Sequence, residues 1–140
     1  MTFKNLNEIE ITDSRNCALI FNFNNKELIT IKSIFRMMGI NDIILLNNEN
    51  INTDIKDILK DEILSDSKEI INSKAIIFNN IDSKKISAVS DNLKRLKIKR
   101  PLLATITDTS INWSLKKLLY NLNEEAISLN ASKSSIHKNL

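Results

Sequence analysis

CALIFNF (residues 17–23) is a short apolar run that ends in asparagine, and KAIIFNN (74–80) repeats the same pattern later in the chain. Apolar runs of this length, bounded by polar residues, predict buried strands rather than helices. DIILLN (42–47) and RPLLATIT (100–107) predict a second pair of strands. Pro101 stands at the start of the last run, where a strand tolerates a missing backbone donor. The sequence therefore predicts four buried strands.

Segments with helical periodicity separate these strands. The first helix is expected to end before Gly39, the only glycine of the chain, in the position of a helix-ending glycine. Asp82 or Ser83 is expected to cap a helix between the third and fourth strands. Thr53 is expected to cap a short helix after the second strand, and a long helix is expected to start near Ser110.

Strands that alternate with helices, and that are apolar almost throughout, favour a parallel sheet covered on both faces. We expect an α/β fold with a small doubly wound sheet of four parallel strands. Numbered along the chain, the favoured strand order is 2-1-3-4, with helices on both faces. The domain is expected to span residues 16–129, after an N-terminal extension (1–15) and before a flexible tail (130–140).

Two short echoes suggest that the chain consists of two βαβ halves. ALIFN (18–22) aligns with AIIFN (75–79) at an offset of 57 residues. GINDII (39–44) aligns with KIKRPL (97–102) at an offset of 58. Internal symmetry of this kind predicts that the two halves fold alike.

The charges are distributed unevenly. Residues 1–73 carry 8 Lys/Arg and 12 Asp/Glu, a net charge of −4, whereas residues 74–140 carry 12 Lys/Arg and 5 Asp/Glu, a net charge of +7. Such a basic half is compatible with nucleic-acid or acidic-protein partners, although no aromatic residues for base stacking lie nearby. Nucleic-acid binding is therefore possible but not favoured. The basic patch consists of Lys94, Arg95, Lys97, Lys99 and Arg100.

Several functional classes are disfavoured by what the chain contains. Cys17 is the only cysteine and His137 the only histidine, so a Cys/His zinc site is excluded and a serine nucleophile has no favourable base. A single glycine argues against a Gly-rich phosphate loop. We therefore lean against an enzyme and expect no catalytic residues, no metal and no cofactor. No signal peptide or membrane span is expected, which favours a cytoplasmic location without membrane contact.

One hypothesis is a small anionic ligand or nucleotide. In open α/β sheets ligands sit beyond the carboxyl ends of the strands, and helix N-termini attract anions. A structural capping role is the alternative interpretation for Thr109 and Ser110. The candidate ligand-binding residues are Asn22, Asn24, Asn79, Asn80, Thr105, Thr107, Thr109 and Ser110.

The leading hypothesis is a non-catalytic module that binds a protein partner or a second copy of itself. Trp113 lies off the apolar stripe of the last helix, and tryptophan is enriched at the centres of protein interfaces. Asn112 and Trp113 are therefore the candidate interaction residues.

KRPLLATITDTSINWSLKKLL (99–119), together with the first and third apolar runs, resembles a family of small bacterial proteins known as domain of unknown function 3783. The resemblance spans roughly residues 16–127. It implies a bacterial cytoplasmic protein but supplies no activity, so no functional residue is transferred. The motif positions are Arg100, Pro101, Thr105, Thr107, Thr109, Ser110, Asn112 and Trp113.

Overall fold

The computed structural model describes residues 15–98 and 101–138, with side chains described as far as residue 128. All four predicted strands are present, and the helices fall between and after them as predicted. The elements are β1 (Cys17–Phe21), α2 (Asn25–Met37), β2 (Ile43–Leu46), η1 (Asn48–Asn50), α3 (Ile55–Ile58), β3 (Ala75–Asn79), α4 (Ser83–Arg95), β4 (Leu102–Thr105), η2 (Ser110–Asn112) and α5 (Leu115–Lys138).

The strand order β2-β1-β3-β4 confirms the prediction, but the directions of the strands do not. β1 runs parallel to β2 and β3 runs parallel to β4, whereas β1 and β3 are antiparallel. The sheet is therefore mixed, and the prediction of four parallel strands was wrong.

The connection from β2 to β3 explains the reversal. It first passes along the sheet through α3 to Leu59, whose carbonyl accepts a hydrogen bond from Arg15 at the start of β1 (2.6 Å). The segment 62–74 then returns, and the carbonyls of Ile71 and Ser73 accept hydrogen bonds from Asn22, just beyond the end of β1. Because the connection makes two passes, β3 begins at the edge where β2 ends. The sequence shows the return segment only as a polar loop.

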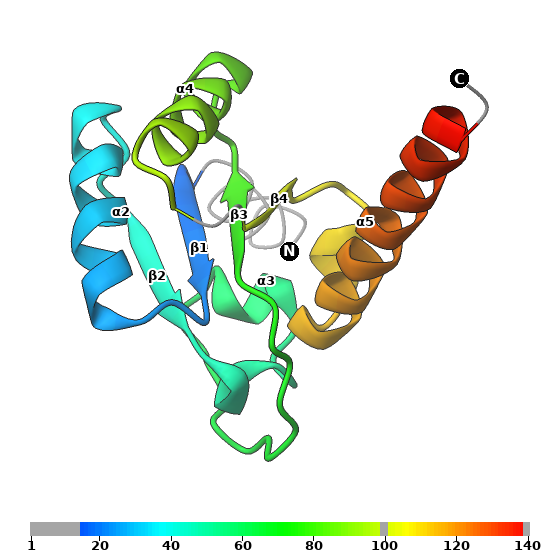
Figure 1. The fold of residues 1–140 in the computed structure, drawn as a ribbon. Coiled ribbons are helices and arrows are strands. Elements are labelled where there is room, and N and C mark those ends of the chain that lie inside the picture. Colours follow the sequence, from blue (N-terminus) through cyan, green and yellow to red (C-terminus); the bar gives the residue numbers. More distant parts are fainter. Residues whose placement is uncertain (1–14, 99–100, 139–140) are drawn as a thin grey trace.

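The sheet is covered on both faces, as predicted, with α2 and α4 on one face and α3 and α5 on the other (Figure 1). Alternation along β1 divides its side chains between two cores. Ala18 and Ile20 face α2 and α4, in what we call the α2–α4 core. Cys17, Leu19 and Phe21 face the opposite side, in the α3–α5 core.

The two βαβ halves repeat at an offset of 58 residues throughout β1, α2 and the turns that flank the helix. At this offset β1 aligns with β3 and α2 with α4, and the bounds of each pair of elements correspond. Asn22 and Asn80, and likewise Gly39 and Lys97, are equivalent positions, and all four have positive φ. The offset of 57 suggested by ALIFN and AIIFN is one residue out of register. It would match Ala18 of the α2–α4 core with Ala75 of the α3–α5 core, because a one-residue slip exchanges the faces of a strand.

The last helix begins later than predicted. Ser110 starts the short η2, and α5 begins at Leu115, where Ser114 Oγ accepts a hydrogen bond from the Lys117 N–H (3.1 Å). α5 continues to Lys138 and therefore includes most of the segment expected to form a tail. Its C-terminal half extends away from the rest of the fold (Figure 1).

Candidate functional site

The predicted ligand residues lie at two opposite edges of the sheet. Because β1 and β3 are antiparallel, Cys17 pairs with Asn79 and Phe21 pairs with Ala75. Asn22 and Asn24 therefore follow one edge, and Asn79, Asn80 and Thr105 lie at the other. The single crevice expected from a parallel sheet does not exist, and this prediction was wrong.

The return segment 62–74 covers the edge that carries Asn22 and Asn24. Asn22 has φ 68° and donates to two carbonyls of the return segment, at Ile71 and Ser73 (both 3.2 Å). Asn24 caps α2 by accepting from the Glu27 N–H (2.8 Å), and Glu27 accepts in turn from the Asn24 N–H. Both asparagines thus have structural roles.

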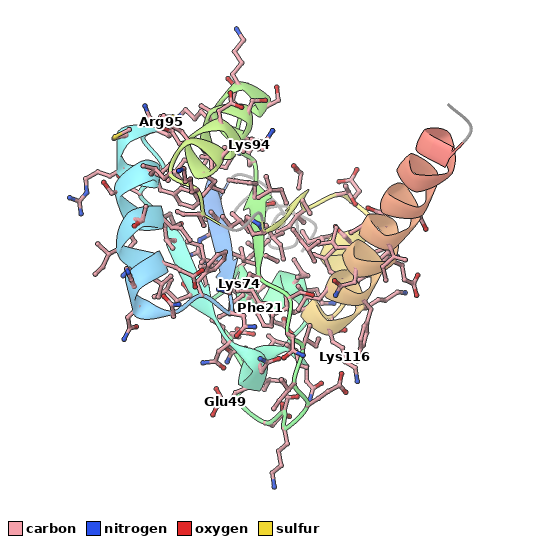
Figure 2. The ribbon with its side chains drawn as sticks, viewed as in Figure 1. Phe21, Glu49, Lys74, Lys94, Arg95 and Lys116 are labelled. Carbon is pink, nitrogen blue, oxygen red and sulfur yellow. The ribbon has the colours of Figure 1, made fainter. Side chains whose placement is uncertain are left out.

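An ion pair lies across the same edge. Lys74 directly precedes β3. Its Nζ lies 2.7 Å from Glu27 Oε1 and 2.6 Å from Glu27 Oε2. Figure 2 shows Lys74 at the end of the sheet where Phe21 lies. The ammonium group keeps the pKa of Glu27 below its ordinary value, because it stabilises the ionised carboxylate.

The opposite edge holds a surface pocket of about 460 Å³. Two of the predicted ligand residues line it, Asn80 at the end of β3 and Thr105 at the end of β4. Asn79 lies beside it and donates to the Arg15 carbonyl (2.8 Å). We call it the second-half pocket, and its lining consists of Asn16, Gly39, Ile40, Asn80, Ile81, Asp82, Lys85 and Thr105.

The second-half pocket carries one charge of each sign. Asp82 caps α4 as predicted, with Oδ1 accepting from the Lys84 N–H (3.1 Å). Lys85 lies one turn further along, and no salt bridge within the described residues reaches it. Asn80 donates to Asn16 Oδ1, which ties the end of β3 to the start of β1.

The TITDTSINW stretch (105–113) is a structural connection between β4 and α5. Thr107 and Ser110 bond reciprocally: each backbone N–H donates to the other residue's hydroxyl (2.9 and 3.1 Å). Ser110 is buried, and Thr109 provides no side-chain cap. The geometry thus gives Thr107 and Ser110 a structural capping role and leaves Thr109 exposed.

Trp113 is half-buried against the α3–α5 core, and its carbonyl accepts from the Ile55 N–H (2.9 Å). Lys117 Nζ lies 4.8 Å from the centre of its ring, in cation–π geometry. Asn112 is exposed, and its amide contacts the Asp108 carbonyl (3.4 Å). Trp113 therefore packs against the core and keeps part of its side chain at the surface.

Exposed apolar side chains lie on α5 and on the return segment beside it. Tyr120 is 45% exposed and Ile127 is 68% exposed, two turns further along the helix. Glu69 of the return segment accepts from the Tyr120 hydroxyl and pairs with Lys116 Nζ (2.9 Å), and its neighbour Ile70 is 74% exposed. A shallow depression of about 410 Å³ on this face is lined by Ser114, Lys116, Lys117, Tyr120, Asn121 and Glu124.

The predicted basic patch is only partly described. Lys94 and Arg95 end α4, and Lys97 occupies the left-handed turn after it (φ 56°), whereas Lys99 and Arg100 lie outside the described residues. Figure 2 shows Lys94 and Arg95 beside α4, far from Lys116 at the start of α5. These lysines and arginines thus do not form one continuous surface with those of α5.

Sequence reasoning missed Asn16, Gly39 and Lys85 as pocket residues and Arg15 as a structural anchor. Arg15 binds both carboxylate oxygens of Asp42 (2.8 and 3.1 Å) as well as the Leu59 carbonyl. The signal for the pocket was the repeat itself, since an offset of 58 pairs Lys85 with Glu27. The signal was lost because the strand echo was aligned at 57.

The remaining chemistry of the described residues is limited. Cys17 is fully buried, and burial raises the pKa of its thiol to about 11. No cluster of three or more His, Cys, Asp and Glu side chains suited to a metal ion occurs in residues 15–98 and 101–138. Within the same ranges, no helix has the length and apolar character needed to cross a membrane.

Comparison with known proteins finds a family match over part of the chain. The model of the family described as Domain of unknown function (DUF3783) matches residues 74–129, from the start of β3 into α5. The match includes the TITDTSINW stretch and leaves out residues 16–73, which the resemblance seen in the sequence had included. Neither the curated proteins nor the solved structures gave a match. The family description names no activity, so function rests on the geometry.

Proposed function

We propose that the protein is a non-catalytic interaction module that pairs with a second copy of itself through the first half of α5. The observation that carries this proposal is the pattern of charges on one face of that helix. Lys117 and Glu124 lie seven residues, or two turns, apart and line the same depression, with Tyr120 and Asn121 between them. This face is complementary to itself.

An antiparallel pair of α5 helices uses that complementarity. If the two-fold axis passes between Tyr120 and Asn121, Lys117 of each copy stands opposite Glu124 of the other. A two-fold interface presents the same patch on both copies, so a single favourable ion pair is formed twice.

Apolar surface supplies the attraction that charges alone do not. Tyr120 lies at the centre of the proposed interface, the partly exposed Trp113 lies at one end, and Ile127 lies at the other. Aromatic anchors surrounded by a polar rim are the usual composition of a protein interface, and isolated surface ion pairs contribute little. The charges therefore set the register, and the apolar groups provide the affinity.

A bacterial, cytoplasmic setting is part of the same proposal. A buried, unpaired Cys17 fits a reducing compartment, since disulfide staples are typical of secreted chains.

The test is the mass of wild type and of Lys117→Glu by size-exclusion chromatography with light scattering. We expect wild type to dimerise and the variant to dissociate at least ~10-fold more readily, because two attractive pairs become repulsive. Lys84→Glu on α4 makes the same charge change outside the interface and should leave the dimer intact. A wild type that stays monomeric at high concentration, or a variant that dimerises like wild type, would refute the proposal.

A further inference from the structure

The second-half pocket has an equivalent in the first half, because the two halves repeat at an offset of 58. The lining residues other than Thr105 have counterparts at this offset. Asn16 corresponds to Lys74, Lys85 corresponds to Glu27, and Asp82 corresponds to Asn24. Both positions lie between the N-terminal turn of a helix and the start of a neighbouring strand. The two halves can therefore be compared residue by residue.

In the first half this position is closed. The Glu27–Lys74 ion pair joins the helix to the strand at 2.6 Å, and Lys74 Nζ also lies 5.8 Å from the centre of the Phe23 ring. The return segment covers the same edge through the carbonyls of Ile71 and Ser73. The ion pair and the return segment thus occupy this position in the first half.

In the second half the same ion pair is impossible. The glutamate is replaced by Lys85 and the lysine by Asn16, so an ammonium group faces a neutral amide. The position remains open, with a volume within the range usual for small-molecule sites. The second half therefore lacks the ion pair that fills this position in the first half, and it has a pocket there instead.

Gly39 also indicates that the second-half pocket is kept open. It has φ 76°, and its counterpart Lys97 adopts φ 56° with a full side chain, so the turn alone does not require glycine. A Cβ at position 39 would lie 3.7 Å from Lys85 Nζ, and a longer side chain would extend into the space that Gly39 lines. The only glycine of the chain therefore stands where it keeps the pocket open.

From this difference between the halves we infer that the second-half pocket binds a small zwitterion, such as a free amino acid. Lys85 supplies a cation for a carboxylate. Asp82 supplies an anion for an ammonium group, because its Oδ2 has no hydrogen bond within the described residues. Ile40 and Ile81 give apolar walls for a side chain. A phosphate dianion fits less well, since the Asp82 carboxylate repels it. This site is independent of the α5 surface.

The experiment is a titration of the ¹⁵N-labelled full chain with each of the twenty proteinogenic L-amino acids, followed by amide chemical shifts. We expect at least one of them to shift Asn16, Gly39 and Lys85 in a saturable way. For that amino acid, its N-acetyl derivative and its carboxamide should bind at least ~10-fold more weakly, because each lacks one charge-assisted contact. Inorganic phosphate should not compete.

Variants test the roles of the Lys85 and Asp82 charges and the need for open space beside Gly39. Lys85→Gln should weaken binding by about tenfold or more, and Asp82→Asn should do the same while keeping a good helix cap. Gly39→Asn should block the pocket, since asparagine tolerates positive φ at Asn22 and Asn80. Lys84→Gln is the matched control and should bind normally.

A double variant recreates the closed half. Asn16→Lys with Lys85→Glu installs the pair found at Lys74 and Glu27, and it should abolish binding. Because Asn16→Lys also removes the hydrogen bond from Asn80, cooperative thermal unfolding is the check that the variant is folded. The inference is overturned if no amino acid shifts these resonances, if the N-acetyl derivative or carboxamide binds as tightly as the zwitterion, or if phosphate binds at this site instead. Binding that survives in the double variant also overturns it.

Discussion

Replacing Glu27 by Gln isolates the ion pair that closes the first half. Glutamine keeps the size of the side chain and an oxygen that can accept from the Asn24 N–H, so the cap of α2 is preserved. Only the charged contact with Lys74 is lost. The glutamate and lysine side chains are 18% and 31% exposed, so the pair is neither fully exposed nor fully buried.

The expected loss of stability follows from that partial burial. Exposed pairs contribute up to about 1 kcal/mol, whereas removing one partner of a buried pair costs about 3–5 kcal/mol. We expect the free energy of unfolding to fall by about 1.5 kcal/mol. With a urea dependence of about 2 kcal/mol per molar, the midpoint falls by about 0.7 M.

The effect depends on pH with a defined sign. Because the pKa of Glu27 is lowered in the folded protein, its stabilisation is fully present above its ordinary value of about 4.3 and is lost as the pH falls through the folded pKa. Urea titrations at pH 7 should separate wild type from Glu27→Gln, and the difference should shrink as the pH is lowered well below about 4.3. Glu62→Gln, at an exposed site, serves as the control. Equal midpoints at pH 7, or a difference that stays constant as the pH falls, would refute this reasoning.

Three further changes probe the rest of the account. Native Cys17 should react with a thiol reagent at pH 8 at least ~100-fold more slowly than in urea, since burial raises its pKa to about 11 and blocks access; equal rates would contradict its burial. Arg15→Met should lower the free energy of unfolding by about 2 kcal/mol, measured in urea, whereas Arg36→Met at an exposed site should change it little. Asn22→Gly should cost about 1 kcal/mol, the value of its contacts, and Asn22→Ala about 1 kcal/mol more, because alanine resists positive φ; equal losses would argue against strain at this turn.

The sequence predicts the elements of this fold better than it predicts their directions. Apolar runs identify β1 to β4, and helical spacing with Gly39 and Asp82 identifies α2 and α4. The direction of β3 depends on the return segment 62–74, which has no helix or strand and therefore no periodicity to detect. A strand buried on both faces has the same composition whether its neighbour runs parallel or antiparallel.

The candidate site was only half predictable for the same reason. Asn80 and Thr105 line one pocket, because each lies at the carboxyl end of its own strand. Asn22 and Asn24 were assigned to the same edge because the sheet was expected to be parallel. Lys85 was missed because nothing in its local sequence distinguishes it from neighbouring Lys84. Lys85 stands out only when it is aligned at the offset of 58 with its counterpart Glu27, which has the opposite charge.

The central claim of self-association through α5 is tested most directly by mixing two variants. Lys117→Glu and Glu124→Lys should each be monomeric by sedimentation velocity, because each places like charges opposite one another across the two-fold axis. Mixed in equal amounts, they should form a heterodimer. In that pair the introduced glutamate of one copy faces the introduced lysine of the other, and the unchanged Glu124 of the first copy faces the unchanged Lys117 of the second. Monomers in the mixture, with a dimeric wild type, would show that the copies pair elsewhere and would contradict the account.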